Sequence, residues 1–119
     1  MDLNELRDAI YQDAVAHGLW EDADRWARAW AFAGEDAERK NLWNTAAQSV
    51  RCEAIELVEV SALDIYNNTD NREHFIEELA DVIIMSLSVA GKLGIDIDAA
   101  VRRKMEINKA RPWKHGETL

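Results

Sequence analysis

The chain has 119 residues, of which 48% are apolar and 31% charged, and this is the composition of a single globular domain. Its 23 acidic and 14 basic residues give a formal net charge of −9. Such a field repels nucleic-acid phosphates and anionic lipid surfaces, so neither polymeric nucleic acid nor a membrane is an expected partner.

The single cysteine and the first residues of the chain indicate a compartment. Cys52 cannot form an intrachain disulfide, and a charged amphipathic segment follows Met1 where a secreted protein would carry an apolar signal. We therefore expect a cytoplasmic protein. Because no histidine lies near Cys52 in the sequence, we expect it to be a small buried residue and not a nucleophile.

Helix is predicted for almost the whole chain, since apolar residues recur at spacings of three and four. A first helix would end at Gly18, and its apolar stripe consists of Leu3, Leu6, Ile10 and Ala14. A short second helix is expected over about residues 21–33.

Two longer helices are expected next, over about residues 41–62 and 72–93, with the polar segment 67–71 as a loop between them. Residues 79–89 of the second of these are strongly apolar but contain Asp81. This stretch is far too short to span a bilayer, so we expect a buried core helix. 

A last helix would be capped by Asp96 or Asp98. It would stop near Arg111, because Pro112 disfavours helical geometry in the residue before it.

The predicted architecture is an all-α bundle of four to five helices forming one domain over residues 1–119. Its core would lie at about 41–111, with helical cover from residues 2–33. A chain this short with so apolar a helix has more apolar surface than one bundle readily covers. We therefore expect an oligomer, either a homodimer or a homotetramer.

Two pairs of carboxylates stand on the two central helices. Glu53 and Glu56 are three residues apart on one, and Glu78 and Asp81 are three apart on the other, so each pair projects from one helical face. Both pairs border apolar stripes, which favours an inward orientation. The alternative is that they are surface acids flanking an ordinary core helix.

Four inward carboxylates would repel one another and resist desolvation, and a hard divalent cation would relieve both costs. Oxygen-only ligands favour Mg²⁺ or Mn²⁺ over zinc, and Mg²⁺ usually binds together with substrate phosphates. A di-iron helical bundle would instead require Glu-x-x-His motifs, which the sequence lacks.

The last helix carries a basic face that we call the cationic comb, formed by Lys104, Asn108 and Arg111. Their spacing of four and three residues aligns them on one side of a helix. Lysine offers a point charge, arginine a bidentate fork and asparagine a neutral donor, which together suit a polyphosphate. The alternative is a solvated helix end whose cations complement the helix dipole.

Three segments, in this order, resemble the MazG-like all-α nucleotide pyrophosphohydrolase superfamily. EAIE at 53–56 resembles the E-x-x-E element of these proteins, ELAD at 78–81 resembles their E-x-x-D element, and KMEINKARPWKHG at 104–116 resembles a C-terminal K-x3-N-x2-R…H-G ending. The superfamily includes dimeric dUTPases, dCTP pyrophosphatase and phosphoribosyl-ATP pyrophosphatase. The resemblance implies a metal site at Glu53, Glu56, Glu78 and Asp81, with Lys104, Asn108 and Arg111 toward the phosphates.

The expected reaction is Mg²⁺-dependent hydrolysis of a nucleoside triphosphate, standard, non-standard or deoxy, to the monophosphate and pyrophosphate. Water would attack the α-phosphorus in line, and one of the three glutamates would also accept its proton. Two alternatives stay open: a catalytically silent helical module for nucleotide binding or oligomerisation, and an activity on phosphoribosyl-ATP.

Aromatic residues are candidates for contacting the nucleotide. Trp113 and His115 follow the cationic comb closely enough to reach a bound substrate, with an exposed tail as the alternative. A base could stack on other tryptophans, although each is also suited to a core or an interface; these are Trp20, Trp26, Trp30 and Trp43.

Overall fold

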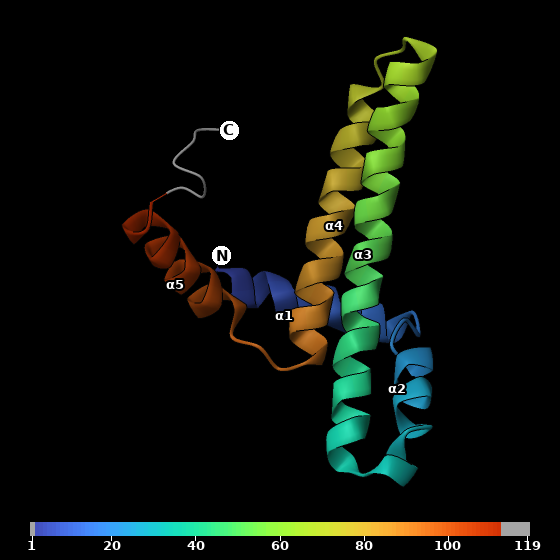
Figure 1. The fold of residues 1–119 in the computed structure, drawn as a ribbon, viewed down its shortest axis with the longest axis vertical. Helices are drawn as coiled ribbons and strands as arrows, with labels where there is room; N and C mark the ends of the chain where they lie inside the picture. Colours follow the sequence, from blue (N-terminus) through green and yellow to red (C-terminus); the bar gives the residue numbers. More distant parts are fainter. Residues whose placement is uncertain (1, 113–119) are drawn as a thin grey trace.

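The computed structural model describes residues 2–112, and it consists of five α-helices and one short 3₁₀-helix (Figure 1). The elements in chain order are α1 (Leu3–Ala16), α2 (Glu21–Arg28), η1 (Ala31–Ala33), α3 (Glu35–Asn67), α4 (Arg72–Lys92) and α5 (Ile97–Ala110). The predicted all-α class is confirmed, and no strand occurs within the described range. None of its helices combines the length and the hydropathy needed to cross a bilayer.

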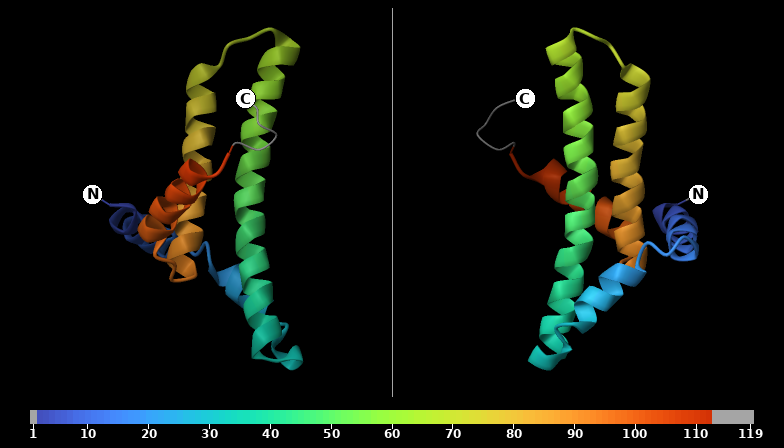
Figure 2. Two further views of the ribbon diagram at one scale, coloured as in Figure 1. Left: turned by 60° about the vertical axis from the view of Figure 1, so that its left-hand side comes forward. Right: turned by 90° about the vertical axis from the view of Figure 1, so that its right-hand side faces the viewer.

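The antiparallel hairpin of α3 and α4 forms the long axis of the molecule (Figures 1 and 2). α3 begins at Glu35, earlier than expected, because Gly34 adopts a φ of 102° that breaks the preceding turn. Acidic residues in its first turn complement the helix dipole. Asn68 ends α3 in the left-handed conformation, with a φ of 54°.

The turn between α3 and α4 is closed by Asp64, whose carboxylate accepts hydrogen bonds from the Thr69 hydroxyl at 2.7 Å and from the Asn71 amide at 3.0 Å. These bonds hold the pKa of Asp64 below its usual value.

α1 crosses the lower part of α4, and α2 lies beside the lower part of α3 (Figure 2). The backbones of α1 and α4 approach closely at Gly91, where an added Cβ would lie 2.5 Å from Tyr11 Cβ. Trp20 is buried beside this crossing, and its indole N–H donates to the hydroxyl of the buried Ser88 at 3.0 Å. Lys92 pairs with Asp24 of α2 at 2.6 Å and ties the end of α4 to α2.

α5 is joined to α1 by reciprocal capping. The side-chain oxygen of Asn4 accepts from the backbone amides of Ile97 at 3.0 Å and Asp98 at 3.3 Å, while Asp98 accepts from the Leu3 amide at 3.3 Å. Asp96 caps α5 as expected, through the Ala99 amide. Hydrogen bonds from Arg102 and then from Leu3 hold the pKa of Asp98 below its usual value.

Two expectations about the core differ from the structure. α5 was expected to join the central helices, but it packs on α1 and leaves residues 99–110 exposed, because its caps come from the start of the chain. α4 was expected to be buried, but only Leu87, Ser88 and Ala90 are buried, since α1 covers just the end of this helix.

Candidate metal centre

Three carboxylates from the two hairpin helices meet at mid-hairpin, and we call them the carboxylate cluster. They are Glu53 of α3 together with Glu78 and Asp81 of α4, and one oxygen from each lies within 4.8 Å of the others. The Glu53 side of α3 faces α4, since Val50, Leu57 and Val60 on the same stripe are also half-buried. The antiparallel packing therefore brings together acids that lie far apart in the sequence.

Glu53 is the electrostatic centre of this cluster. Burial raises the pKa of Glu53 above its usual value, and the charges of Glu56, Asp81 and Glu78 raise it further. Glu56 thus acts on the cluster although it does not belong to the three-oxygen group. Such mutual repulsion is the condition that a divalent cation would relieve.

Glu78 supplies a test of whether a cation fits. Its side chain is only 15% exposed, and His74 Nε2 lies 3.1 Å from Glu78 Oε1. The other oxygen, Oε2, is buried without a hydrogen-bond partner among the described residues. A buried carboxylate oxygen without a partner is costly, so this atom has the character of a vacant ligand. The oxygen-only donor set suits Mg²⁺ or Mn²⁺.

His74 was missed by the sequence reasoning, although its spacing of four from Glu78 was a usable signal. It contacts one oxygen of the Glu78 carboxylate and leaves the other without a hydrogen-bond partner among the described residues. That is the usual role of a group that orients a metal-binding carboxylate.

The sequence predicts that all four acids point inward, but two of them do not. Glu53 and Glu78 are partly buried, whereas Glu56 and Asp81 are exposed. Glu53 and Glu78 lie in the contact between α3 and α4, whereas Glu56 and Asp81 lie at the edge of this contact. The cluster is therefore open to solvent on one side.

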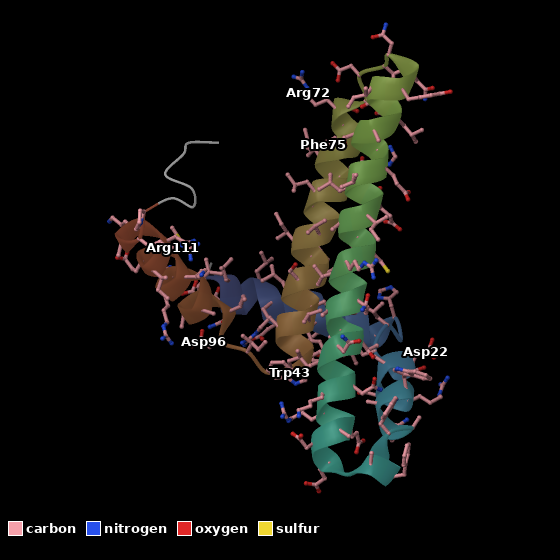
Figure 3. The ribbon with its side chains drawn as sticks, viewed as in Figure 1. Asp22, Trp43, Arg72, Phe75, Asp96 and Arg111 are labelled. Carbon is pink, nitrogen blue, oxygen red and sulfur yellow. The ribbon has the colours of Figure 1, made fainter. Side chains whose placement is uncertain are left out.

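The cationic comb does not meet the carboxylate cluster within this chain. Lys104 and Asn108 are exposed on α5, which packs on α1. Arg111 lies at the outer end of α5, away from the α3–α4 hairpin (Figure 3). Arg111 is the C-cap of α5, with φ −101° and ψ 150°, and its amide donates to the Ile107 carbonyl oxygen, so the helix ends at Arg111 as predicted. Trp113 and His115 lie outside the described residues.

Other candidates are distributed differently from expectation. Cys52 is exposed, so the expectation of burial was wrong. Trp20 belongs to the core, while the remaining tryptophans of the described range stay substantially exposed; these are Trp26, Trp30 and Trp43.

Comparison with known proteins gives two matches. A family model described as the MazG-like family matches residues 48–119, which is more than half of the chain. A protein of Cyanophage S-2L named dATP/dGTP diphosphohydrolase is 43% identical over 47 residues, a stretch that covers 40% of this chain and 45% of that protein. The chain therefore spans less than half the length of this curated relative. No solved structure matches the chain.

Proposed function

The chain belongs to the MazG-like family, and we propose that it hydrolyses nucleoside triphosphates to the monophosphate and pyrophosphate with Mg²⁺ bound. Two observations carry this proposal: Glu53, Glu78 and Asp81 meet between the two helices, and one oxygen of Glu78 is buried without a hydrogen-bond partner among the described residues. A solvent-open group of oxygen ligands is suited to a cation that is shared with a phosphate.

In this proposal Glu53, Glu56, Glu78 and Asp81 hold Mg²⁺, with Mn²⁺ able to replace it. When bound, the ion neutralises phosphate charge and lowers the pKa of a water molecule. His74 keeps the Glu78 carboxylate oriented. Glu56 is exposed and lies outside the three-oxygen group, so of the glutamates that hold the ion it is the one that we assign also to accept the proton of the attacking water.

The cationic comb is assigned to the phosphates. Lys104 and Asn108 are exposed on α5, which packs on α1. To contact phosphates bound at a carboxylate cluster, α5 must lie close to an α3–α4 hairpin, either its own or that of a second chain. We place Arg111, Trp113 and His115 in the same substrate-binding end. The assembly is proposed to be a homodimer or homotetramer in the cytoplasm.

The substrate class is proposed from the relative. Its printed name specifies dATP and dGTP, so deoxypurine triphosphates are the first substrates to test. The matched stretch includes less than half of that protein, so the panel must also contain pyrimidine and ribonucleoside triphosphates.

The test is product analysis. Purified protein is incubated with each triphosphate, with Mg²⁺ or with EDTA, and products are separated by anion-exchange chromatography. We expect monophosphate and pyrophosphate in the Mg²⁺ samples alone. A diphosphate with orthophosphate would place attack at the γ-phosphorus and refute the proposal. Nucleotide binding without any product would establish the silent-module alternative instead.

A further inference from the structure

A groove of about 450 Å³ lies between α1 and α4, and no residue of the carboxylate cluster lines it. Its walls are mostly apolar, and the residues that line it include Ala9, Ile10 and Ala14 of α1 and Ile84 and Met85 of α4. The volume lies within the range of pockets that bind small organic molecules.

The residues of α4 that line the groove lie one to two helical turns from Asp81, on the same side of that helix. Ile84 and Met85 follow Asp81 by three and four residues, which is one helical turn, and Ser88 follows by seven, which is two turns. Met85 also lies two turns from Glu78. Since one turn advances about 5.4 Å, a ligand with its phosphates at the cluster extends its next groups into the groove.

The polar groups at the rim define what kind of ligand fits. Asp13 and His17 line the groove, and His17 Nδ1 lies 2.8 Å from the Asp13 carbonyl oxygen and 3.5 Å from Asp13 Oδ1. The hydroxyl of Ser88 already accepts from Trp20. An ionised aspartate can only accept hydrogen bonds, so the groove favours a flat group that presents N–H donors.

We propose that the α1–α4 groove binds the base of the substrate and that Asp13 selects bases carrying an exocyclic amino group. Guanine presents a ring N–H beside its amino group and matches a carboxylate with two bonds. Thymine and uracil place their single N–H between two carbonyl oxygens, which a carboxylate repels. This assignment deepens the proposed function and rests on it for the position of the phosphates.

The proposal is tested by methyl NMR on protein labelled at its methionines, titrated with dGMP or dTMP in the presence of Mg²⁺. We expect dGMP to shift the Met85 signal, identified by its loss in Met85→Leu, and to leave Met105 unmoved, because Met105 lies on α5 outside the groove. Binding of dTMP should be about tenfold weaker, which corresponds to one charge-assisted hydrogen bond.

Variants on α1 identify the selecting residue. Asp13→Asn should reduce the preference for dGMP over dTMP by about tenfold, whereas Asp8→Asn, on the same helix but outside the groove, should preserve it. Ala9→Leu should weaken both nucleotides by filling the groove.

Several results would overturn the assignment. These are an unmoved Met85 signal, a preference that survives Asp13→Asn, or a change in molecular mass with Ala9→Leu, which would identify the groove as a contact between chains. Product analysis separates this proposal from the previous one. A Met85 shift without pyrophosphate release would refute the hydrolytic function alone, whereas pyrophosphate release without a Met85 shift would refute the base groove alone.

Discussion

At the level of single residues, Glu53 is the group whose ionisation is opposed by its surroundings in the metal-free protein. Its pKa in the folded state is raised by burial and by the neighbouring charges of Glu56, Asp81 and Glu78. A carboxyl group with a raised folded-state pKa favours the folded state while it is protonated, and this contribution is lost as the pH rises. At neutral pH the cluster therefore opposes folding until a cation neutralises it.

Asp81→Asn is expected to abolish hydrolysis while leaving the metal-free protein as stable as the parent or more stable. The substitution removes one of the charges that oppose ionisation of Glu53. Because Asp81 is exposed, solvent screening limits the gain in the free energy of unfolding to about 1 kcal/mol or less. Thermal melts in EDTA measure this change.

The same melts with excess Mg²⁺ complete the test. Mg²⁺ should raise the Tm of the parent protein by mass action and that of Asp81→Asn much less. Glu77→Gln is the matched control, since Glu77 is an exposed acid of α4 outside the carboxylate cluster. A variant that melts lower in EDTA, with no Mg²⁺ response in either protein, would mean that Asp81 is a structural ion-pair partner.

At the level of helices, Gly91→Ala provides a test of the crossing between α1 and α4. Alanine in place of glycine inside a helix ordinarily stabilises a protein by about 1 kcal/mol. Here the new Cβ would lie 2.5 Å from Tyr11 Cβ and would force the helices apart. We expect the free energy of unfolding, measured with urea, to fall by about 1–3 kcal/mol. A decrease in place of the usual increase would identify the close approach of the two helices. An increase in stability would show that the helices do not approach closely at Gly91.

The cationic comb makes a prediction about α5. Lys104→Ala and Arg111→Ala should each lower kcat/KM by about tenfold or more, because each removes a charge-assisted phosphate contact. Helical content by circular dichroism should not change, since both side chains are exposed. Arg103→Ala is the matched control on the same helix. Unchanged kcat/KM in both comb variants would show that this surface is only solvated.

Local signals in the sequence predicted most of the helices, but not how they pack. Gly18, Gly94 and Asp96 mark ends where the structure has them, because each acts on its own turn. The capping of α5 by Asn4 was missed, since a contact between the two ends of the chain leaves no periodic pattern.

The site was predictable to a similar extent. Spacing of three identified the faces that carry the acids, and packing of α3 on α4 then brought three of them together. Periodicity could not separate Glu78, which is partly buried, from Asp81, which is exposed at the edge of the contact between α3 and α4. It also could not reveal that α5 is oriented away from the hairpin (Figure 3).

At the level of the whole molecule, the hairpin exposes more apolar surface than an isolated helical chain normally does. One stripe on α3 contains Ile55, Val58 and Ile65, and one on α4 contains Ile76, Leu79 and Ile83. The exposed fraction reaches 84% at Ile65 on the first stripe and 57% at Ile76 on the second, and Ile83 is 53% exposed. Contiguous apolar surface of this kind marks a protein interface.

We therefore predict that the protein is at least a dimer, in which a second copy covers these stripes. Light scattering at micromolar concentration should give a mass of two or more chains. Ile83→Glu should lower that mass, because a buried unpaired charge is costly at an interface. Val15→Glu is the matched control, since Val15 is similarly exposed on α1 and lies outside both stripes. Burial of the stripes would also place two carboxylate clusters in one assembly and bring each hairpin within reach of a second α5. A monomeric parent protein would contradict the prediction, and the cationic comb could then contact phosphates only at the hairpin of its own chain.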